Sequence, residues 1–146
     1  MTRIAAFAAA VAFILAGCAG GDVVTGDRRN VGVVSVVFSA RPARARVGQT
    51  VQLTLKLVNN SGESRSIDFP EKRFYDFWAV RGSREVWRWS DEQVFEQVPV
   101  TVNLASQTPE TYEESWTPEE SGTYRVFAAV ASREYERPLV GEVIVE

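Results

Sequence analysis

The residue types in this chain exclude most nucleophilic and metal-assisted chemistry. It has no histidine and one cysteine, Cys18. Without an imidazole no Ser-His or Cys-His pair can form, and the commonest metal ligand is missing. The carboxylate pairs Glu113-Glu114 and Glu119-Glu120 are adjacent, so on strands the two members point to opposite faces, without the ordered spacing of a Ca²⁺ site. We therefore expect a protein that is not an enzyme and holds no metal or cofactor.

Cys18 follows a segment that has the length of a signal peptide. Residues 4–16 are thirteen consecutive Ala, Val, Ile, Leu and Phe residues, preceded by one basic side chain, Arg3. As a helix they would rise about 20 Å, which is short of the roughly 30 Å hydrocarbon core of a bilayer. The pattern therefore predicts a signal peptide over residues 1–17 and argues against a transmembrane helix.

The four residues Leu15-Ala16-Gly17-Cys18 resemble the lipobox of bacterial lipoproteins. The resemblance implies cleavage before Cys18, a diacylglycerol thioether on its sulfur and acylation of the new amino group. Two or three acyl chains, at about 0.8 kcal/mol per buried methylene, hold a protein stably on a bilayer. The partner is then the cell membrane or outer membrane of a bacterium, with the domain outside the cytoplasm. The alternative is an ordinary secretory signal that leaves a free thiol beside its cleavage site.

Charge is distributed unevenly along a chain whose net charge is −3. Six basic and no acidic residues lie between Arg28 and Lys56, whereas nine glutamates and three arginines lie between Glu110 and Glu146. The basic stretch either contacts anionic headgroups beside the anchor, at about 1 kcal/mol per residue, or forms a solvated linker and strand edge. The overall acidity argues against nucleic acid as a partner.

Nearly all of the chain after residue 30 has the pattern of short β-strands. In residues 51–57 apolar side chains alternate with polar ones, which indicates a half-buried antiparallel strand. Residues 18–30 contain Gly and Asp and few large apolar side chains, so we expect a flexible tether there. Further strands are expected at 31–38, 64–69, 74–80, 85–89, 98–104, 111–116, 124–131 and 139–145, and a single helical turn or a loop at 91–97.

Eight or nine strands at about ten-residue spacing predict an all-β fold, an immunoglobulin-like antiparallel β-sandwich over residues 31–146. Tyr124, two residues after Gly122 at the start of the penultimate strand, has the setting of a tyrosine corner. In such sandwiches the tyrosine hydroxyl bonds back to the connection that precedes its strand. The cysteine pair of antibody domains is missing, which excludes that particular family.

An ordered set of short blocks lies in the middle of the chain. An aromatic-Asp-Phe strand is followed by a turn, a Val-Trp-Arg-Trp-Ser block, a phenylalanine and a Tyr-x-x-x-Trp end. These blocks, over residues 50–116, resemble the intracellular proteinase inhibitor family, also called the BsuPI domain. The motif residues are Tyr75, Asp76, Phe77, Trp87, Arg88, Trp89, Ser90, Phe95, Tyr112 and Trp116.

The Trp-Arg-Trp-Ser block has two interpretations. On a strand, Trp87 and Trp89 point to one face while Arg88 and Ser90 point to the other. Either both tryptophans are core residues and Arg88 pairs with Asp76 or a glutamate across the sheet, or the tryptophans form an exposed ledge for a partner. The core interpretation is favoured, and Asp76 is expected to be a structural hydrogen-bond acceptor, not an active carboxylate.

The resemblance implies proteinase inhibition. A small rigid sandwich blocks a proteinase when it presents a loop that fits the cleft but is held too firmly for turnover. One candidate inhibitory loop consists of Arg81, Gly82, Ser83 and Arg84, and a second of residues 132–138, because both carry arginines that suit a trypsin-like pocket.

The competing hypothesis is a lipid-tethered module that binds another envelope protein or a polymer without inhibiting anything, because a fold does not determine a function. The founding member of the family is described as cytoplasmic. Cys18 and the apolar segment before it predict export instead.

Overall fold

The computed structural model describes residues 23–146, which contain eleven β-strands and two short 3₁₀ helices. The predicted signal peptide and Cys18 lie outside these residues. Within residues 23–146 no helix has the length and apolar character needed to cross a membrane. The elements are β1 Thr25–Val31, β2 Val34–Arg41, β3 Arg44–Ala45, β4 Val51–Asn59, β5 Arg65–Phe69, β6 Tyr75–Arg81, β7 Arg84–Arg88, η1 Trp89–Glu92, β8 Val100–Leu104, β9 Glu110–Trp116, β10 Gly122–Val130, η2 Arg133–Tyr135 and β11 Leu139–Val145.

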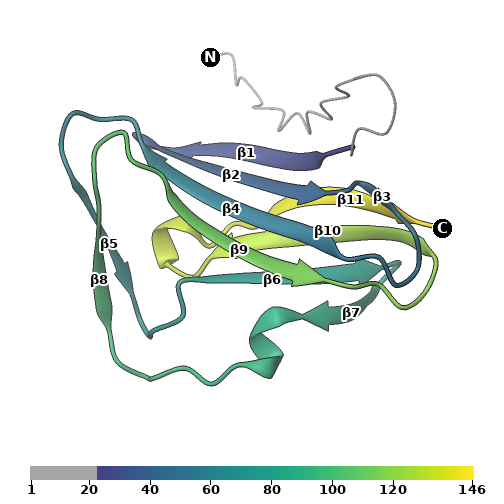
Figure 1. Cartoon of the computed structure of the whole chain (residues 1–146). Coiled ribbons are helices and arrows are strands. Elements are labelled where there is room, and N and C mark those ends of the chain that lie inside the picture. Colours follow the sequence, from purple (N-terminus) through teal and green to yellow (C-terminus); the bar gives the residue numbers. More distant parts are fainter. Residues whose placement is uncertain (1–22) are drawn as a thin grey trace, which may run out of the picture.

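Two sheets pack face to face (Figure 1). The first has the strand order β1-β2-β4-β9 and the second the order β3-β11-β10-β6-β7. β3 pairs in parallel with β11, and the other strand pairs are antiparallel. The predicted immunoglobulin-like sandwich is confirmed, with β1 and β3 as two strands that were not expected.

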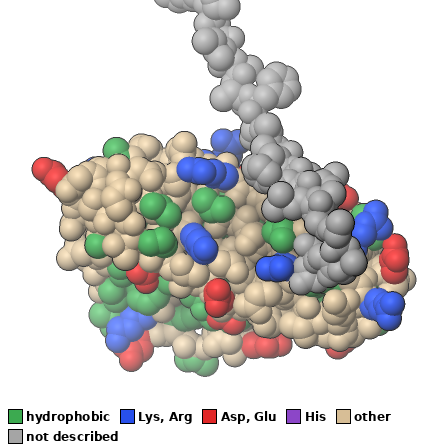
Figure 2. Space-filling model, turned by 45° about the horizontal axis from the view of Figure 1, so that its top comes forward, with side chains coloured by type: hydrophobic (Ala, Val, Ile, Leu, Met, Phe, Trp, Pro, Cys, Tyr) green, Lys and Arg blue, Asp and Glu red, His purple; other side chains and the backbone are tan. Residues whose placement is uncertain are grey.

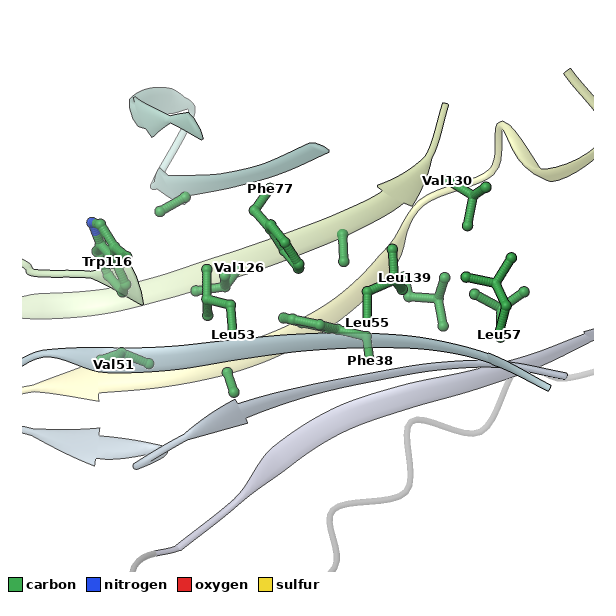
Figure 3. Packing of buried hydrophobic residues seen from close by; sticks show 14 of the residues in the cluster. Phe38, Val51, Leu53, Leu55, Leu57, Phe77, Trp116, Val126, Val130 and Leu139 are labelled. Carbon is green, nitrogen blue, oxygen red and sulfur yellow. The ribbon is translucent and has the colours of Figure 1, made fainter. Parts of the chain in front are cut away.

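The core lies between the sheets, as Figure 3 shows. The alternation predicted for β4 is confirmed, since its inward side chains are at most 1% exposed: Val51, Leu53, Leu55 and Leu57. Phe38 of β2 and Phe77 of β6 meet across the interior with ring centroids 6.2 Å apart. Burial of such large apolar side chains is the main stabilising term of the fold.

Tyr124 on β10 confirms the predicted tyrosine corner. Its hydroxyl donates to the backbone carbonyl of Glu120 at 2.6 Å, and its ring packs edge-on against Trp116 at a centroid distance of 4.9 Å. The two contacts hold the β9–β10 connection against the end of the sandwich.

Residues 25–30, predicted as part of a flexible tether, form β1 instead. β1 pairs with β2 along its whole length. Its side chains also reach the edge of β11, where Asp27 Oδ2 accepts from Val140 N–H at 3.3 Å and Thr25 Oγ1 accepts from Glu142 N–H at 3.2 Å. The prediction was wrong because it relied on the lack of large apolar residues, whereas backbone pairing and these polar contacts hold β1 in place.

The small sheet β5-β8 closes one end of the core and positions the residues before β8. Asn59 at the end of β4 is fully buried, and its amide donates to the carbonyls of Glu63 at 2.6 Å and Leu104 at 3.1 Å. These bonds fix the end of β8 to β4. Residues 93–99, which lead from η1 to β8, run along the bottom of Figure 1.

Candidate functional site

The predicted hairpin joins β6 to β7 through a two-residue turn, Gly82-Ser83. Gly82 has a φ of 64°, a left-handed conformation that favours glycine and is typical of tight hairpin turns. Arg81 and Arg84 pair directly across the turn. The backbone of both arginines is therefore held in a strand ladder, and the turn offers no extended segment to a proteinase cleft.

Arg81 is engaged within the protein. Its guanidinium forms an ion pair with Glu120 Oε2 at 2.5 Å, donates to the carbonyl of Ser121 at 3.2 Å and lies 6.0 Å from the ring centroid of Tyr124. The hydrogen bond that Arg81 donates to Glu120, together with the negative charge of Glu120, raises the pKa of Arg81. These contacts connect the hairpin to the β9–β10 connection beside a groove of about 340 Å³. Arg84 is exposed, whereas Arg81 is partly exposed and held by these contacts.

The second predicted loop, residues 132–138, contains the helical turn η2. Tyr135 in this turn is buried. The carbonyls of Arg137 and Pro138 accept hydrogen bonds from the guanidinium of Arg29 on β1. The segment is thus folded against the sandwich and lacks the extended shape of a bound proteinase substrate.

Asp76 is the centre of a polar cluster formed with Arg88 and Ser90, which we call the polar centre. Asp76 is 5% exposed. Its Oδ1 accepts from the N–H of Phe77 at 2.9 Å and of Ser90 at 3.2 Å. Its Oδ2 accepts from the Ser90 hydroxyl and from Arg88 Nη1, both at 2.7 Å. The predicted role of Asp76 as a structural acceptor is confirmed, and its carboxylate joins β6, β7 and η1.

Arg88 divides its guanidinium between two carboxylates. Besides Asp76 it contacts Glu85, whose Oε1 accepts from Nε at 3.0 Å and from Nη2 at 2.6 Å. The guanidinium carbon lies 4.4 Å from the ring centroid of Trp78, which is a cation–π distance. Burial lowers the pKa of Arg88, but the hydrogen bonds to Glu85 and Asp76 outweigh burial and raise it. Asp76 is therefore the predicted partner across the sheet, whereas Glu85 lies on the same strand as Arg88.

Four motif side chains, Tyr112, Tyr75, Trp89 and Phe95, form a continuous aromatic stack. Tyr75 stacks on Tyr112 at a centroid distance of 4.6 Å and on Trp89 at 4.5 Å. Trp89 in turn contacts Phe95 at 5.7 Å. The aromatic stack begins on β9 in the first sheet, crosses to β6 in the second and ends in the residues after η1. It therefore ties residues 93–99 to both sheets.

Trp87 packs in a different place from Trp89. Its ring lies 6.4 Å from that of Trp116, which is 4% exposed. Trp87 and Trp89 are both partly buried and pack against the core, as the core interpretation predicts. The two residues do not share a strand face, however, because β7 ends at Arg88 and Trp89 begins η1.

Residues 93–99 have no regular secondary structure and form the exposed end of this assembly. The backbone of Gln93 is extended, with φ −116° and ψ 153°. The side chain of Val94 is 100% exposed and that of Val98 is 50% exposed. Phe95 lies between these valines in sequence and is anchored on the aromatic stack. The motif had marked Phe95, but sequence reasoning missed the exposed segment around it.

The residues between β5 and β6 hold the same segment from a second side. The N–H of Lys72 donates to the carbonyl of Glu96 at 3.0 Å, and the two side chains form an ion pair at 2.5 Å. Gln97 Nε2 donates to Glu71 Oε2 at 2.8 Å. Residues 95–97 are therefore fixed on one side by the aromatic stack and on the other by Glu71 and Lys72.

A further aromatic pair, absent from the sequence predictions, lies on the outer face of β6 and β10. Trp78 and Phe127 are opposite each other in the ladder and stack with centroids 5.3 Å apart. Arg88 lies over Trp78, and Arg125 lies 5.6 Å from the centroid of Phe127. Both rings are partly exposed. Strand alternation could have found this pair, because Phe77 points inward and its neighbour must point outward.

The basic residues between Arg28 and Lys56 lie on or between the strands β1 to β4 and not in a linker. Arg28 donates to the Ser35 hydroxyl at 3.3 Å, and Arg44 pairs with Glu146 at 3.3 Å. On the face shown in Figure 2, Lys and Arg side chains are separated by other residues and form no continuous patch.

The described residues contain no group of three or more Asp, Glu, His or Cys side chains placed to hold a metal ion. Glu114 of the adjacent pair Glu113-Glu114 is used structurally, since its Oε1 accepts from the Tyr75 hydroxyl at 2.5 Å. The oxygens of Asp76 are likewise occupied by protein donors. The exposed segment 93–99 is the part of this site that is accessible to a partner.

Fold and site together define an immunoglobulin-like sandwich that holds one surface segment by a polar centre and an aromatic stack. The family profile described as intracellular proteinase inhibitor, BsuPI, matches residues 38–135. This match covers more than half of the chain, which therefore belongs to the BsuPI family. It extends beyond the predicted 50–116 at both ends, so β10 and η2 are part of the family domain as well.

Solved structures resemble this chain at low sequence identity. The sporulation control protein Spo0M from Bacillus subtilis has a TM-score of 0.50 and 14% identity over 79% of this chain and 50% of its own. A CARDB domain from Pyrococcus furiosus has a TM-score of 0.41 and 17% identity over 77% of this chain and 87% of its own. A β-glucosidase from Erythrobacter marinus has a TM-score of 0.44 and 12% identity over 84% of this chain, which spans 16% of the enzyme. At 14% identity the likeness to Spo0M shows the fold alone. A search of curated proteins gives no match.

Replacing Asp76 by alanine should lower the free energy of unfolding by about 2–4 kcal/mol, because Arg88 and Ser90 would lose their shared acceptor in a buried position. Urea denaturation measures the change. Asp68→Ala is the matched control, since exposed Asp68 accepts one side-chain hydrogen bond, from Thr101, and its loss should cost about 0.5 kcal/mol or less. Equal losses in the two variants would contradict a central role for Asp76.

Stability should fall as the pH rises above the ordinary tyrosine pKa of 10.0. Burial and the charge of Glu110 raise the pKa of Tyr112 to about 12, and burial and the hydrogen bond that the Tyr75 hydroxyl donates to Glu114 raise the pKa of Tyr75. Because the raised pKa belongs to the folded state, the unfolded chain ionises first, and stability present below pH 10 is lost toward pH 12. Urea midpoints between about pH 8 and 11.5 measure this loss. Tyr112→Phe should make the pH dependence shallower, and an unchanged slope would contradict the assignment.

Proposed function

We propose that this chain is a lipid-anchored bacterial lipoprotein whose BsuPI domain binds and inhibits a proteinase outside the cytoplasm. Membership of a family described as proteinase inhibitors is the observation that carries the proposal. The domain acts by binding alone, without a catalytic step of its own. The anchored surface segment supports this function, because an inhibitor must present a rigid segment to the cleft of its target.

The proposed anchor lies close to the domain. Six residues, 19–24, separate Cys18 from the first residue of β1. Fully extended they span at most about 20 Å, so the domain would be held near the membrane surface. β1 lies along the top of the sandwich in Figure 1, and residues 93–99 run along the bottom. A protein anchored through Cys18 would thus have this segment on the side opposite its attachment.

A panel of proteinases tests the inhibitory function. Full-length protein, purified from membranes in detergent, is titrated against trypsin, chymotrypsin, subtilisin and pancreatic elastase with small chromogenic substrates. We expect stoichiometric inhibition of at least one enzyme at micromolar protein or below. The Asp76→Ala variant should inhibit that enzyme more weakly, because the polar centre fixes η1. Full activity of all four enzymes at micromolar protein would sink the inhibitor proposal.

The second candidate function is a non-inhibitory binding module of the cell envelope, and the Trp78–Phe127 pair favours it. Stacked, partly exposed rings beside Arg88 and Arg125 suit a planar or cationic group of a partner. A lack of inhibition in the panel, combined with capture of an envelope protein that Trp78→Ala abolishes, would establish this alternative.

The lipid anchor predicts a specific behaviour of the Cys18→Ala variant. Wild-type protein should remain with membranes after a high-salt wash and carry the mass of a diacylglycerol thioether on its amino-terminal cysteine, because two or more acyl chains bind a bilayer stably. The variant should lack this mass and leave the membrane fraction. A variant that stays with the membranes in high salt, or a wild-type protein without the lipid mass, would contradict the anchor.

A further inference from the structure

We infer that residues 93–99 are the segment that enters the proteinase cleft, with Val94 in a specificity pocket that takes a small aliphatic side chain. This inference rests on the proposed inhibitory function and names its contact site and the class of its target. It replaces the Arg81–Arg84 turn as the contact, because that turn is tight and Arg81 is bound to Glu120 and Ser121.

The shape of the segment suits a proteinase cleft. Clefts of this kind bind peptides in an extended form, with backbone hydrogen bonds and pockets for individual side chains. The backbone at Gln93 is extended, and residues 93–99 belong to no sheet whose pairing would have to be broken. Val94 is 100% exposed, so its whole side chain is available to a pocket. A small aliphatic residue at this point selects an elastase-like pocket over the acidic pocket of trypsin.

The contacts around Val94 make the segment rigid before it meets a partner. The ring centroid of Phe95, the next residue, lies 5.7 Å from that of Trp89. The guanidinium carbon of Arg73 lies 5.9 Å from the Phe95 centroid. The carbonyl of Glu96 is held by the N–H of Lys72 at 3.0 Å. Little conformational freedom remains to be lost on binding, which raises affinity. If the Val94–Phe95 bond were cut, Phe95 would carry the new amino group and would stay in place through these contacts. This opposes release of the fragment and so opposes turnover.

The negative charge of residues 91–99 favours a cleft whose rim is basic. Residues 91–99 contain Asp91, Glu92 and Glu96 and no basic residue. Asp91 and Glu92 are exposed in η1, directly before the extended segment. An acidic segment of this kind associates faster with a cleft that has a basic rim, and the association rate falls as salt is added.

The test uses full-length protein in detergent and pancreatic elastase as the probe. Val94→Asp should raise the inhibition constant by about 30-fold or more, the effect typical of a central contact residue. Val94→Arg should weaken inhibition of elastase and create inhibition of trypsin. Val47→Asp is the matched control, because Val47 is an exposed valine (47%) in the connection between β3 and β4, and it should leave the constant unchanged. Circular dichroism melting confirms that each variant is folded.

A second variant tests the anchoring separately. Phe95→Ala removes the contact with Trp89 and Arg73, so elastase should cleave this variant at the bond after Val94, whereas wild-type protein stays intact under the same conditions. Mass spectrometry of the fragments identifies the bond. Cleavage of the wild-type and variant proteins at equal rates would overturn the claim that the anchoring prevents turnover.

The outcomes separate this inference from the proposed function. Inhibition of elastase or of another enzyme of the panel that is unaffected by Val94→Asp would overturn the inference and leave the inhibitory function standing. Loss of inhibition in Arg84→Ala would overturn the inference and assign the inhibitory contact to the β6–β7 turn. A lack of inhibition of every enzyme would remove the inhibitory function itself, and the contact site with it.

Discussion

The buried carboxylate of Asp76 is the constraint on which the arrangement of this site depends. A charge that is 5% exposed must be paired and hydrogen-bonded, or its desolvation would destabilise the fold. Two of its partners lie beyond the strand that carries it, since Arg88 ends β7 and Ser90 lies in η1. Satisfying Asp76 therefore ends β7 and turns the chain into η1. That turn places Trp89 on the aromatic stack and leads to the exposed residues 93–99.

Polar centre and aromatic stack have complementary roles. The hydrogen bonds of Asp76 are directional and determine where η1 begins, whereas the stack of Tyr112, Tyr75, Trp89 and Phe95 supplies buried area across both sheets. Of the ten motif residues three are buried and seven are partly buried. The segment that they hold in place contains one of them, Phe95. The family motif thus consists of residues that support the segment 93–99, and the residues that contact a partner are free to differ between members.

The sequence predicted what depends on local pattern and failed where the contacts are remote. The alternation of apolar and polar residues predicted β4. The tyrosine corner is a known feature of immunoglobulin-like sandwiches, and the Asp76–Arg88 pair was expected between neighbouring strands. The engagement of Arg81 by Glu120 joins residues that are distant in sequence, and no local signal announces it. β1 was missed because its stability comes from pairing with β2 and from the edge of β11. The exposed segment was missed because irregular, acidic residues resemble an ordinary loop until the contacts of Phe95 are known.

The central claim is that residues 93–99 are rigid in the free protein because the polar centre holds η1. Backbone ¹⁵N relaxation of the full chain in detergent micelles measures this directly. The account predicts order parameters of about 0.85 for Val94 and its neighbours, equal to those of β10, and a fall below about 0.6 in Asp76→Ala. Order parameters below about 0.6 for this segment in the wild-type protein would contradict the account.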